Sequence, residues 1–244
     1  MDSKELSYDF AKAWDLSQGE FAQNIANRIL AYKEANNKNF KSVYDICCGS
    51  SNLLSVLHDC GFICYGTETS QGMYEYSKNK IPDATYFLTE KISDLPGKEK
   101  VDIITCTHDV INYFEEFDEC KQLFKNVSKK LNKHGIFIFD FYSKFKLTNW
   151  NESTYKSSPT LDCLTTVKSG VYDKTVLTYT YYINYNNYYI KTKDIITESY
   201  YELETITNAL KEVGLKNIQI VDSNLNPIEY NQYAERIYII ASHK

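Results

Sequence analysis

The stretch Val43-Tyr44-Asp45-Ile46-Cys47-Cys48-Gly49-Ser50-Ser51-Asn52 predicts a buried strand, a tight turn and the start of a helix. Its first part is apolar except for Asp45, as expected for a strand inside a sheet. The small residues at positions 47, 49 and 51 allow the backbone of the turn to approach a ligand closely. A strand, a turn and a helix in this order are typical of the first unit of a ligand-binding α/β sheet.

The alternation of strands and helices continues after this stretch. Apolar, β-rich segments predict strands at residues 42–47, 62–67, 85–88, 101–107 and 135–141. Helical spacing of apolar residues predicts helices at residues 52–60, 71–80 and 116–131. Nearly continuous apolar strands are typical of parallel strands that helices cover on both faces. The predicted fold class is α/β, with a Rossmann-like, doubly wound, mostly parallel sheet and right-handed crossovers.

The pattern of the sequence changes after Trp150. Residues 175–184 and 188–197 are rich in Thr, Tyr and Ile and alternate with a period of two, which is typical of strands. Asn186-Asn187 lies between them and predicts a tight turn. The sequence therefore predicts an antiparallel β hairpin inserted after the fifth strand.

The last part of the chain returns to the pattern of the first half. A helix is predicted at residues 202–213, where Gly214 stops it, and two strands follow at residues 217–221 and 236–241. We expect these strands to join the main sheet, with the last strand antiparallel to the others.

The position of the insertion predicts its role. Ligands of open α/β sheets bind beyond the carboxyl ends of the strands, and the insertion follows the carboxyl end of the fifth strand. We therefore expect a Rossmann-like core of residues 1–144 and 200–244 and an inserted, β-rich substrate cover of residues 145–199.

The composition is that of an ordinary globular protein. With 43% hydrophobic and 24% charged residues, the chain of 244 residues can bury a core. Its formal net charge of -5 disfavours nucleic acid, because binding to phosphates requires basic surfaces. Residues 1–19 lack the apolar stretch of a signal peptide, and no apolar run is long enough to span a membrane. We expect a cytoplasmic monomer or homodimer that binds neither nucleic acid nor membrane.

The seven cysteines do not show the spacing of a metal site. Cys47, Cys48, Cys64 and Cys106 lie in or beside apolar runs and are expected to be small, reduced core residues. The adjacent pair Cys47-Cys48, followed by Cys60 and Cys64, does not form two spaced pairs of ligands. We therefore expect no bound metal.

Glu68 stands at the end of the second predicted strand, nineteen positions after Gly49. A carboxylate about 20 residues after a glycine turn is placed to accept hydrogen bonds from the hydroxyl groups of a ribose. The turn and the carboxylate together predict a site for a cofactor that contains adenosine.

The turn itself indicates which kind of cofactor binds. A dinucleotide favours Gly-x-Gly-x-x-Gly, but Cys47 and Asn52 occupy the first and third of these positions. Asp45 would repel a phosphate and would tolerate an ammonium group. An adenosine cofactor with an amino acid moiety is therefore favoured. The alternatives are an NAD-dependent oxidoreductase and a non-catalytic module that keeps the fold.

The sequence resembles the class I S-adenosylmethionine-dependent methyltransferases at two motifs. The first family motif, Asp-x-Gly-x-Gly-x-Gly, is matched by Asp45, Cys47, Gly49 and Ser51, of which Cys47 and Ser51 depart from glycine. The acidic second motif, Asp-x-Ser-x-x-Met, is similar to Glu68-Thr69-Ser70-Gln71-Gly72-Met73.

The resemblance extends over nearly the whole chain. Residues 8–15 look like the family's lead helix, residues 106–113 like its loop after strand four, and residues 130–140 like its turn into strand five. Residues 201–215 are similar to its last helix and the following turn. Lys91 departs from the family, because many relatives have an acidic residue beside the adenine.

The residue pattern and the resemblance together imply a site with two parts. The residues expected to contact S-adenosylmethionine are Tyr8, Trp14, Asp45, Cys47, Gly49, Ser50, Glu68, Thr69, Met73, Ile92 and Thr107. The residues expected to contact the acceptor are Asp109, Tyr113, Tyr142 and Tyr200.

The expected reaction is transfer of the methyl group to a nitrogen or oxygen atom of a small-molecule acceptor. Methyl transfer from a sulfonium needs alignment and desolvation, and it needs a base only for protonated or weakly acidic acceptors. His108 follows the fourth strand and titrates near neutral pH, so it is the candidate base.

Overall fold

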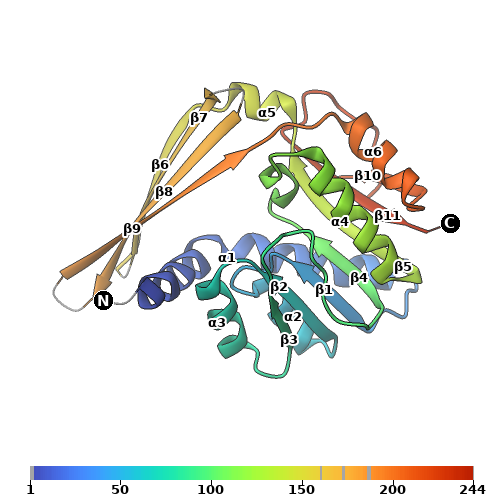
Figure 1. Cartoon of the computed structure of the whole chain (residues 1–244), viewed down its shortest axis with the longest axis horizontal. Helices are drawn as coiled ribbons and strands as arrows, with labels where there is room; N and C mark the ends of the chain where they lie inside the picture. Colours follow the sequence, from blue (N-terminus) through green and yellow to red (C-terminus); the bar gives the residue numbers. More distant parts are fainter. Residues whose placement is uncertain (1–2, 160, 172–173, 186–187, 244) are drawn as a thin grey trace.

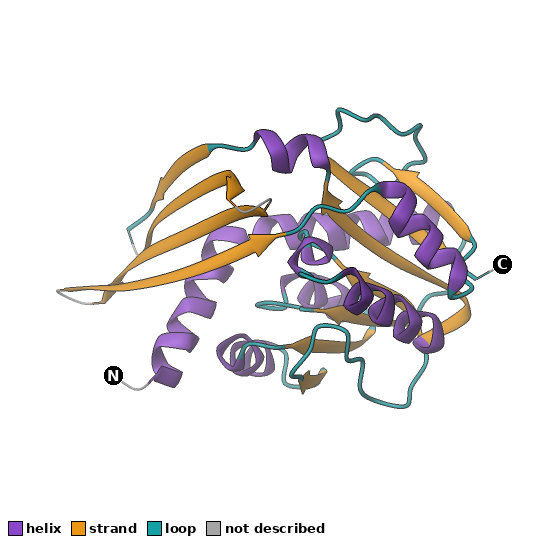
Figure 2. Ribbon diagram, turned by 45° about the horizontal axis from the view of Figure 1, so that its top comes forward, coloured by secondary structure: helices purple, strands orange, loops and turns teal. Residues whose placement is uncertain are grey.

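The structure is a computed structural model that describes residues 3–159, 161–171, 174–185 and 188–243. These residues form a large sheet with helices on both faces and a second sheet that extends to one side (Figures 1 and 2). The large sheet has seven strands in the order β10-β11-β5-β4-β1-β2-β3. Their bounds are β1 (Ser42–Ile46), β2 (Ile63–Glu68), β3 (Thr85–Leu88), β4 (Val101–Cys106), β5 (Leu131–Tyr142), β10 (Asn217–Val221) and β11 (Arg236–Ser242).

The strand directions agree with the expected α/β fold. The pairs β1–β2, β1–β4, β2–β3 and β4–β5 are parallel, and β11 is antiparallel to its neighbours β5 and β10. The doubly wound, mostly parallel sheet with an antiparallel last strand is therefore confirmed. Strand β5 begins at Leu131 instead of Gly135, because the preceding helix ends at Lys130 and the chain enters the strand directly.

Helices cover both faces of this sheet. Their bounds are α1 (Ser3–Ala35), α2 (Asn52–Asp59), α3 (Gln71–Lys80), η1 (Val110–Tyr113), α4 (Phe117–Lys130), α5 (Lys144–Asn149) and α6 (Leu203–Glu212). Tyr44 and Phe137 pack on the face covered by α4 and α6, whereas Val43 and Ile138 pack on the face covered by α1 and α2. Burial on both faces explains the continuous apolar strands. None of the described helices is long and apolar enough to cross a membrane.

The insertion forms an antiparallel sheet in the order β6-β7-β8-β9. Its strands are β6 (Glu152–Ser157), β7 (Leu161–Val171), β8 (Lys174–Tyr185) and β9 (Tyr188–Glu198). The predicted hairpin corresponds to β8 and β9, and its turn at Asn186-Asn187 lies outside the described residues. Strands β6 and β7 are not predicted from the sequence. All of β6 is exposed, so it lacks the hydrophobic alternation on which such a prediction depends.

Helix α1 contacts both sheets. Toward its C-terminal end, Ile25 and Ile29 belong to the hydrophobic cluster that contains α2. Toward its N-terminal end, Phe10 and Ala13 pack with Tyr181 of β8. Figure 1 shows the helix running from the second sheet to the large sheet. The helix therefore supports the insertion and forms a wall beside the carboxyl ends of the parallel strands.

Candidate cofactor and acceptor site

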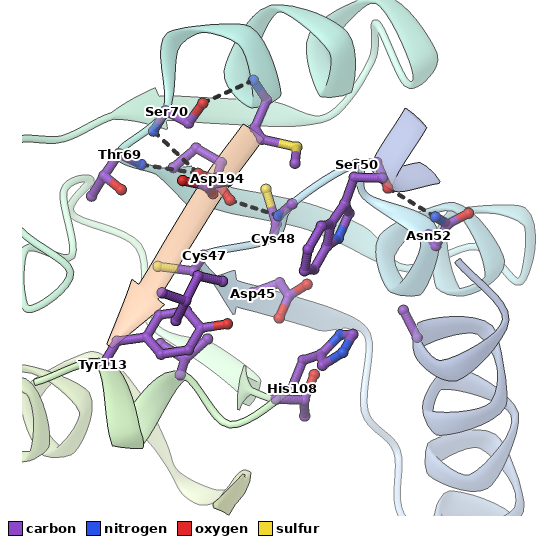
Figure 3. Close-up of a pocket in the computed structure, with 18 of the residues that line it drawn as sticks. Asp45, Cys47, Cys48, Ser50, Asn52, Thr69, Ser70, His108, Tyr113 and Asp194 are labelled. Carbon is purple, nitrogen blue, oxygen red and sulfur yellow. Dashed lines mark hydrogen bonds between the residues drawn. The ribbon is translucent and has the colours of Figure 1, made fainter. Parts of the chain in front are cut away.

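A cavity of about 560 Å³ lies beyond the carboxyl ends of β1, β2 and β4 (Figure 3). Its walls include the turn after β1, the start of α3, the loop after β4, helix α1 and strand β9. The predicted site residues that border it are Trp14, Asp45, Cys47, Gly49, Ser50, Glu68, Thr69, Met73, Ile92, Thr107, His108 and Tyr113. The fold therefore brings most of the predicted residues to one place.

The turn after β1 has a left-handed backbone conformation at every second residue. The φ angle is 51° at Cys47, 55° at Gly49 and 58° at Ser51. A residue with a side chain is disfavoured there by about 1 to 2 kcal/mol, whereas glycine is not. These are the three glycine positions of the family motif, so the backbone explains that motif. The Cys48 amide donates to the Thr67 carbonyl (3.0 Å) and helps to hold the turn despite the two substitutions.

Glu68 joins this turn to the start of α3. Its Oε1 accepts a hydrogen bond from the Gly49 amide (2.7 Å), and its Oε2 accepts from the amides of Thr69 (3.1 Å) and Ser70 (3.3 Å). Burial raises the pKa of the carboxyl group, and the three amides partly oppose this shift. A carboxylate offers about four acceptor positions, so one is still available to a ligand hydroxyl.

Asp45 is a second buried carboxyl group at the cavity. Its Oδ1 accepts a hydrogen bond from Thr105 Oγ1 (2.6 Å). Burial raises its pKa to about 7, the Thr105 bond opposes the rise, and the charge of Glu68 adds to it. A cationic group placed beside Asp45 would stabilise the ionised form.

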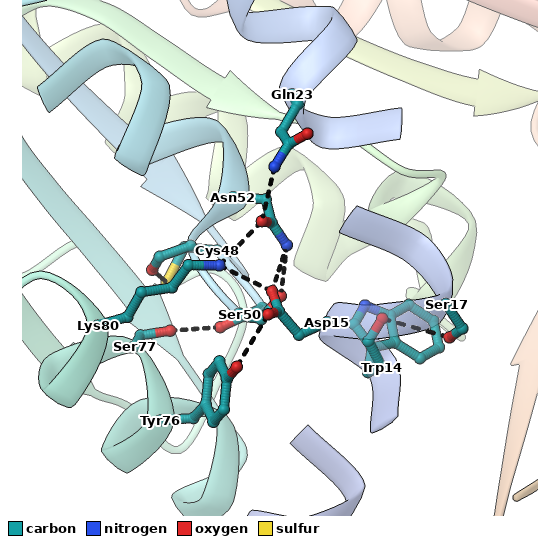
Figure 4. Close-up of polar contacts among 12 residues, drawn as sticks. Trp14, Asp15, Ser17, Gln23, Cys48, Ser50, Asn52, Tyr76, Ser77 and Lys80 are labelled. Carbon is teal, nitrogen blue, oxygen red and sulfur yellow. Dashed lines mark hydrogen bonds and ion pairs between the residues drawn. The ribbon is translucent and has the colours of Figure 1, made fainter. Parts of the chain in front are cut away.

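A polar network fixes α1 to the elements that follow the turn (Figure 4). Asp15 accepts hydrogen bonds from Asn52 Nδ2 (2.5 Å), Lys80 Nζ (2.8 Å) and Tyr76 OH (2.8 Å). Burial alone would raise the pKa of Asp15, but hydrogen bonds from Lys80, Tyr76 and Ser50, together with the charge of Lys80, outweigh it, and the pKa is lowered. The network is not predicted from the sequence, because its members lie on three helices that are distant along the chain.

His108 borders the cavity from the loop after β4. Its ring lies 4.7 Å from the Phe21 ring and 5.7 Å from the Trp14 ring, measured between centroids. Burial lowers the pKa of the imidazole, Asp109 raises it and Arg236 lowers it, with a net decrease. The imidazole is therefore neutral at neutral pH and can accept a proton.

Arg236 and Asp140 hold this loop in place, although the sequence does not indicate either role. Asp140 accepts hydrogen bonds from the amides of His108 (2.8 Å) and Asp109 (3.1 Å). The guanidinium of Arg236 pairs with Asp140 and with Asp109, at 2.6 Å in the second case. It also lies over the Tyr142 ring, 4.0 Å from the centroid.

Four predicted site residues do not border the cavity. The ring of Tyr8 packs against that of Tyr76, with centroids 5.4 Å apart. Asp109 turns toward Arg236, whose guanidinium in turn covers Tyr142. Tyr200 borders a separate cavity of about 460 Å³ beside α5. Their contacts with cofactor or acceptor stay predictions.

The cavity is also bordered by residues that the sequence analysis does not assign to the site. They are Phe10, Gly19, Ala22, Cys48, Asn52, Leu53, Ser70, Val110, Thr192, Lys193, Asp194 and Ile196. Four of them belong to β9, so one strand of the insertion borders the same cavity as the turn after β1 and the loop after β4. The period-two pattern of this strand indicates which residues share a face, but it does not indicate what that face contacts.

Comparison with known proteins identifies the family. The family model described as a methyltransferase domain matches residues 17–220. The chain therefore belongs to the methyltransferase domain family. The resemblance to the class I S-adenosylmethionine-dependent methyltransferases and the predicted Rossmann-like fold are confirmed. The match also argues against an NAD-dependent oxidoreductase.

Relatives with the same fold span most of the chain. An S-adenosylmethionine-dependent methyltransferase from Clostridium acetobutylicum ATCC 824 has a TM-score of 0.81 at 24% identity, over 96% of this chain and 98% of its own. The sugar N-methyltransferase KedS8 from Streptoalloteichus sp. ATCC 53650 has a TM-score of 0.72 at 14% identity, over 93% of this chain and 87% of its own.

A curated relative from Geobacillus sp. (strain WCH70), named as a methyltransferase, is 26% identical over 150 residues, 60% of each protein. The match thus spans less than two thirds of this curated relative.

Proposed function

We propose that the protein transfers the methyl group of S-adenosylmethionine to a nitrogen or oxygen atom of a small-molecule acceptor. One observation carries this proposal: the turn after β1, the loop after β4 and strand β9 of the insertion border a single cavity. In this assignment, the turn binds the cofactor, the loop faces the transferred methyl group, and residues 145–199 cover the acceptor.

The residues at the cofactor end of the cavity fit S-adenosylmethionine. The cofactor supplies a methyl group on a cationic sulfonium, which becomes a neutral thioether after transfer. We assign Asp45 to its ammonium group, because this buried carboxyl group accepts a hydrogen bond from Thr105 and would be stabilised by a cation. We assign the remaining acceptor position of Glu68 to a ribose hydroxyl, and Ile92 to the adenine.

The chain contributes alignment and exclusion of water to the reaction. Trp14 and Tyr113 border the cavity from α1 and η1, and Ile196 borders it from the insertion. Holding the reacting atoms near contact can lower a barrier by roughly 7 to 11 kcal/mol. Neutral His108 is the candidate base for an acceptor that arrives protonated.

The small-molecule assignment is supported by the size of the cavity and by one relative. A volume of about 560 Å³ is within the range of small-molecule sites. KedS8, which shares the fold, is a sugar N-methyltransferase. The cytoplasmic location and the monomeric or homodimeric state stay predictions.

Binding of S-adenosylhomocysteine should raise the melting temperature of the protein, whereas NAD should leave it unchanged. A ligand at 100 times its Kd adds about 2.7 kcal/mol to the free energy of unfolding. Thermal-shift measurements with both ligands test the cofactor, and production of S-adenosylhomocysteine in the presence of acceptors tests turnover. A larger shift with NAD would contradict the proposal. Cofactor binding without turnover on any acceptor would instead identify a non-catalytic relative.

Replacing Glu68 by alanine should weaken S-adenosylmethionine binding by roughly 10- to 150-fold. This range corresponds to the loss of hydrogen bonds to a charged group, about 1.5 to 3 kcal/mol. Because Glu68 also binds three backbone amides, the variant should melt at a lower temperature, and calorimetry should be done where it is fully folded. Glu68→Asp should lose less affinity. Glu90→Ala, at an exposed position outside the cavity, is the matched control. Parent-like affinity of Glu68→Ala would remove the ribose assignment.

A further inference from the structure

The side chains on one face of β9 lie partly at the cavity and partly in the protein interior. Asp194 lies opposite Tyr179 of β8, and Glu198 lies opposite Thr175. Because side chains alternate along a strand, Asp194, Ile196 and Glu198 share one face. Asp194 and Ile196 border the cavity. Glu198 is therefore the next side chain of this face, just beyond the residues that form the cavity wall.

Glu198 is a buried carboxyl group without a hydrogen-bond donor. The residue is 1% exposed, and neither of its carboxyl oxygens has a donor among the described residues. It faces a second carboxyl group, that of Asp109. Buried polar groups are almost always satisfied in native proteins, and an exception indicates a functional role or a missing partner.

The surroundings of Glu198 contain an excess of negative charge. Asp109 and Asp140 share the single guanidinium of Arg236. Glu198 is thus a third carboxyl group near this guanidinium, while the Lys174 ammonium on β8 donates to Ser199 Oγ (2.7 Å). Burial, and then the charge of Asp109 and a hydrogen bond with it, raises the pKa of Glu198 well above its ordinary value, while Arg236 opposes the shift. Burial and Asp109 therefore favour the protonated form of Glu198, and a second cation bound beside it would favour the ionised form.

Tyrosine rings connect this carboxyl cluster with the cavity. Tyr113 borders the cavity, and burial, and then the charges of Asp109, Tyr179 and Glu198, raises the pKa of its phenol. The Tyr142 ring lies against the Arg236 guanidinium, and burial, and then the charge of Asp109, raises the pKa of its phenol. Aromatic faces together with carboxylates form a favourable environment for an ammonium group.

We propose that Glu198 and Asp109 form a subsite that recognises a protonated amine of the acceptor, with Tyr113 and Tyr179 as its aromatic walls. This inference rests on the proposed function and narrows the acceptor to an amine. The ammonium group donates hydrogen bonds to the two carboxylates, and Glu198 releases its proton to water as it ionises. Before methyl transfer, the ammonium group loses one proton to neutral His108, which leaves the nitrogen lone pair free to attack the methyl group. The hydroxyl group of an alcohol in the same position has no positive charge to stabilise the ionised form of Glu198.

The variant Glu198→Gln separates recognition from a structural role. Glutamine has the size and neutral charge of protonated Glu198, so the fold of the free protein should be retained. It cannot ionise when an ammonium group arrives. The surface variant Glu204→Gln, on the exposed side of α6, is the matched control. Glu198→Asp keeps an ionisable group and should retain part of the amine preference.

The test uses cofactor-loaded full-length protein and a panel in which each primary amine is paired with its hydroxyl counterpart, such as glucosamine with glucose. We expect the parent and Glu204→Gln to bind and methylate amines in preference to alcohols. In Glu198→Gln, amine binding should fall by about 10- to 150-fold, as for loss of a charge-assisted hydrogen bond. Calorimetry in two buffers of different ionisation enthalpy should detect release of about one proton per bound amine in the parent and none in the variant.

Two results would overturn the amine subsite: equal use of alcohols by the parent, or an unchanged amine preference in Glu198→Gln. Each is independent of the proposed function. Binding of S-adenosylmethionine and its conversion to S-adenosylhomocysteine are measured in the same samples and would still identify a methyltransferase if the amine preference were absent.

Discussion

Replacing His108 by glutamine is expected to lower kcat by about 100- to 10 000-fold for an acceptor that binds in its protonated form. The neutral imidazole borders the cavity and can accept the acceptor's proton, whereas a glutamine amide cannot. Affinity for S-adenosylmethionine should stay near that of the parent, because the change removes proton transfer and leaves the cofactor turn intact. Steady-state kinetics and cofactor titration together check this result.

The pH dependence of the reaction provides a second measurement of the role of His108. Burial and Arg236 lower its pKa, and Asp109 and Asp140 raise it, with a net position below the ordinary value of about 6.5. The rate of the parent should therefore rise with pH through this pKa and then become constant, and His108→Gln should lack this acidic limb. His134→Gln, at an exposed position near the start of β5, is the control. A parent-like pH profile in His108→Gln would mean that a group other than His108 takes the proton from the substrate.

Replacing Arg236 by methionine should lower the free energy of unfolding by about 3 to 5 kcal/mol. The change leaves Asp140 and Asp109 buried without their shared cation, and the amides of the loop after β4 cannot neutralise two carboxylates. Methionine retains most of the packing against the Tyr142 ring, so the loss reports mainly on charge. Urea unfolding of both proteins measures the difference.

The matched control for Arg236 is Lys144→Met. Lys144 forms an exposed ion pair with Glu202, and such a pair contributes about 0 to 1 kcal/mol. A loss below 1 kcal/mol at neutral pH would mean that water compensates these carboxylates and that Arg236 does not hold the loop.

The sequence predicts a strand or helix well where the burial of that element is visible in the pattern of its own residues. Strands such as Val101–Cys106 are apolar throughout, because helices cover both of their faces, and this property is visible residue by residue. Strand Glu152–Ser157 is present in the structure although every residue in it is exposed. It is held by pairing with β7, and strand pairing of this kind leaves no hydrophobic pattern in the sequence.

The same distinction applies to the site. The contacts of Gly49 and Glu68 follow from a turn and a neighbouring strand end, which the spacing of nineteen residues indicates. Arg236 reaches Asp109 across 127 positions, and Glu198 reaches the loop after β4 from the far end of the insertion. Such contacts depend on strand order and register, which the sequence of one chain does not contain.

The position of α1 has a consequence for the design of chimeras that exchange residues 145–199 between relatives. Phe10 and Ala13 pack on the insertion, while Ile25 and Ile29 pack on the core. Transplanting residues 145–199 alone into a relative would therefore separate the insertion from the first turns of the helix that complement it. These turns precede residue 17, where the match to the family model begins. The segments to be exchanged are therefore not continuous in sequence. A chimera should carry the start of the chain together with the insertion.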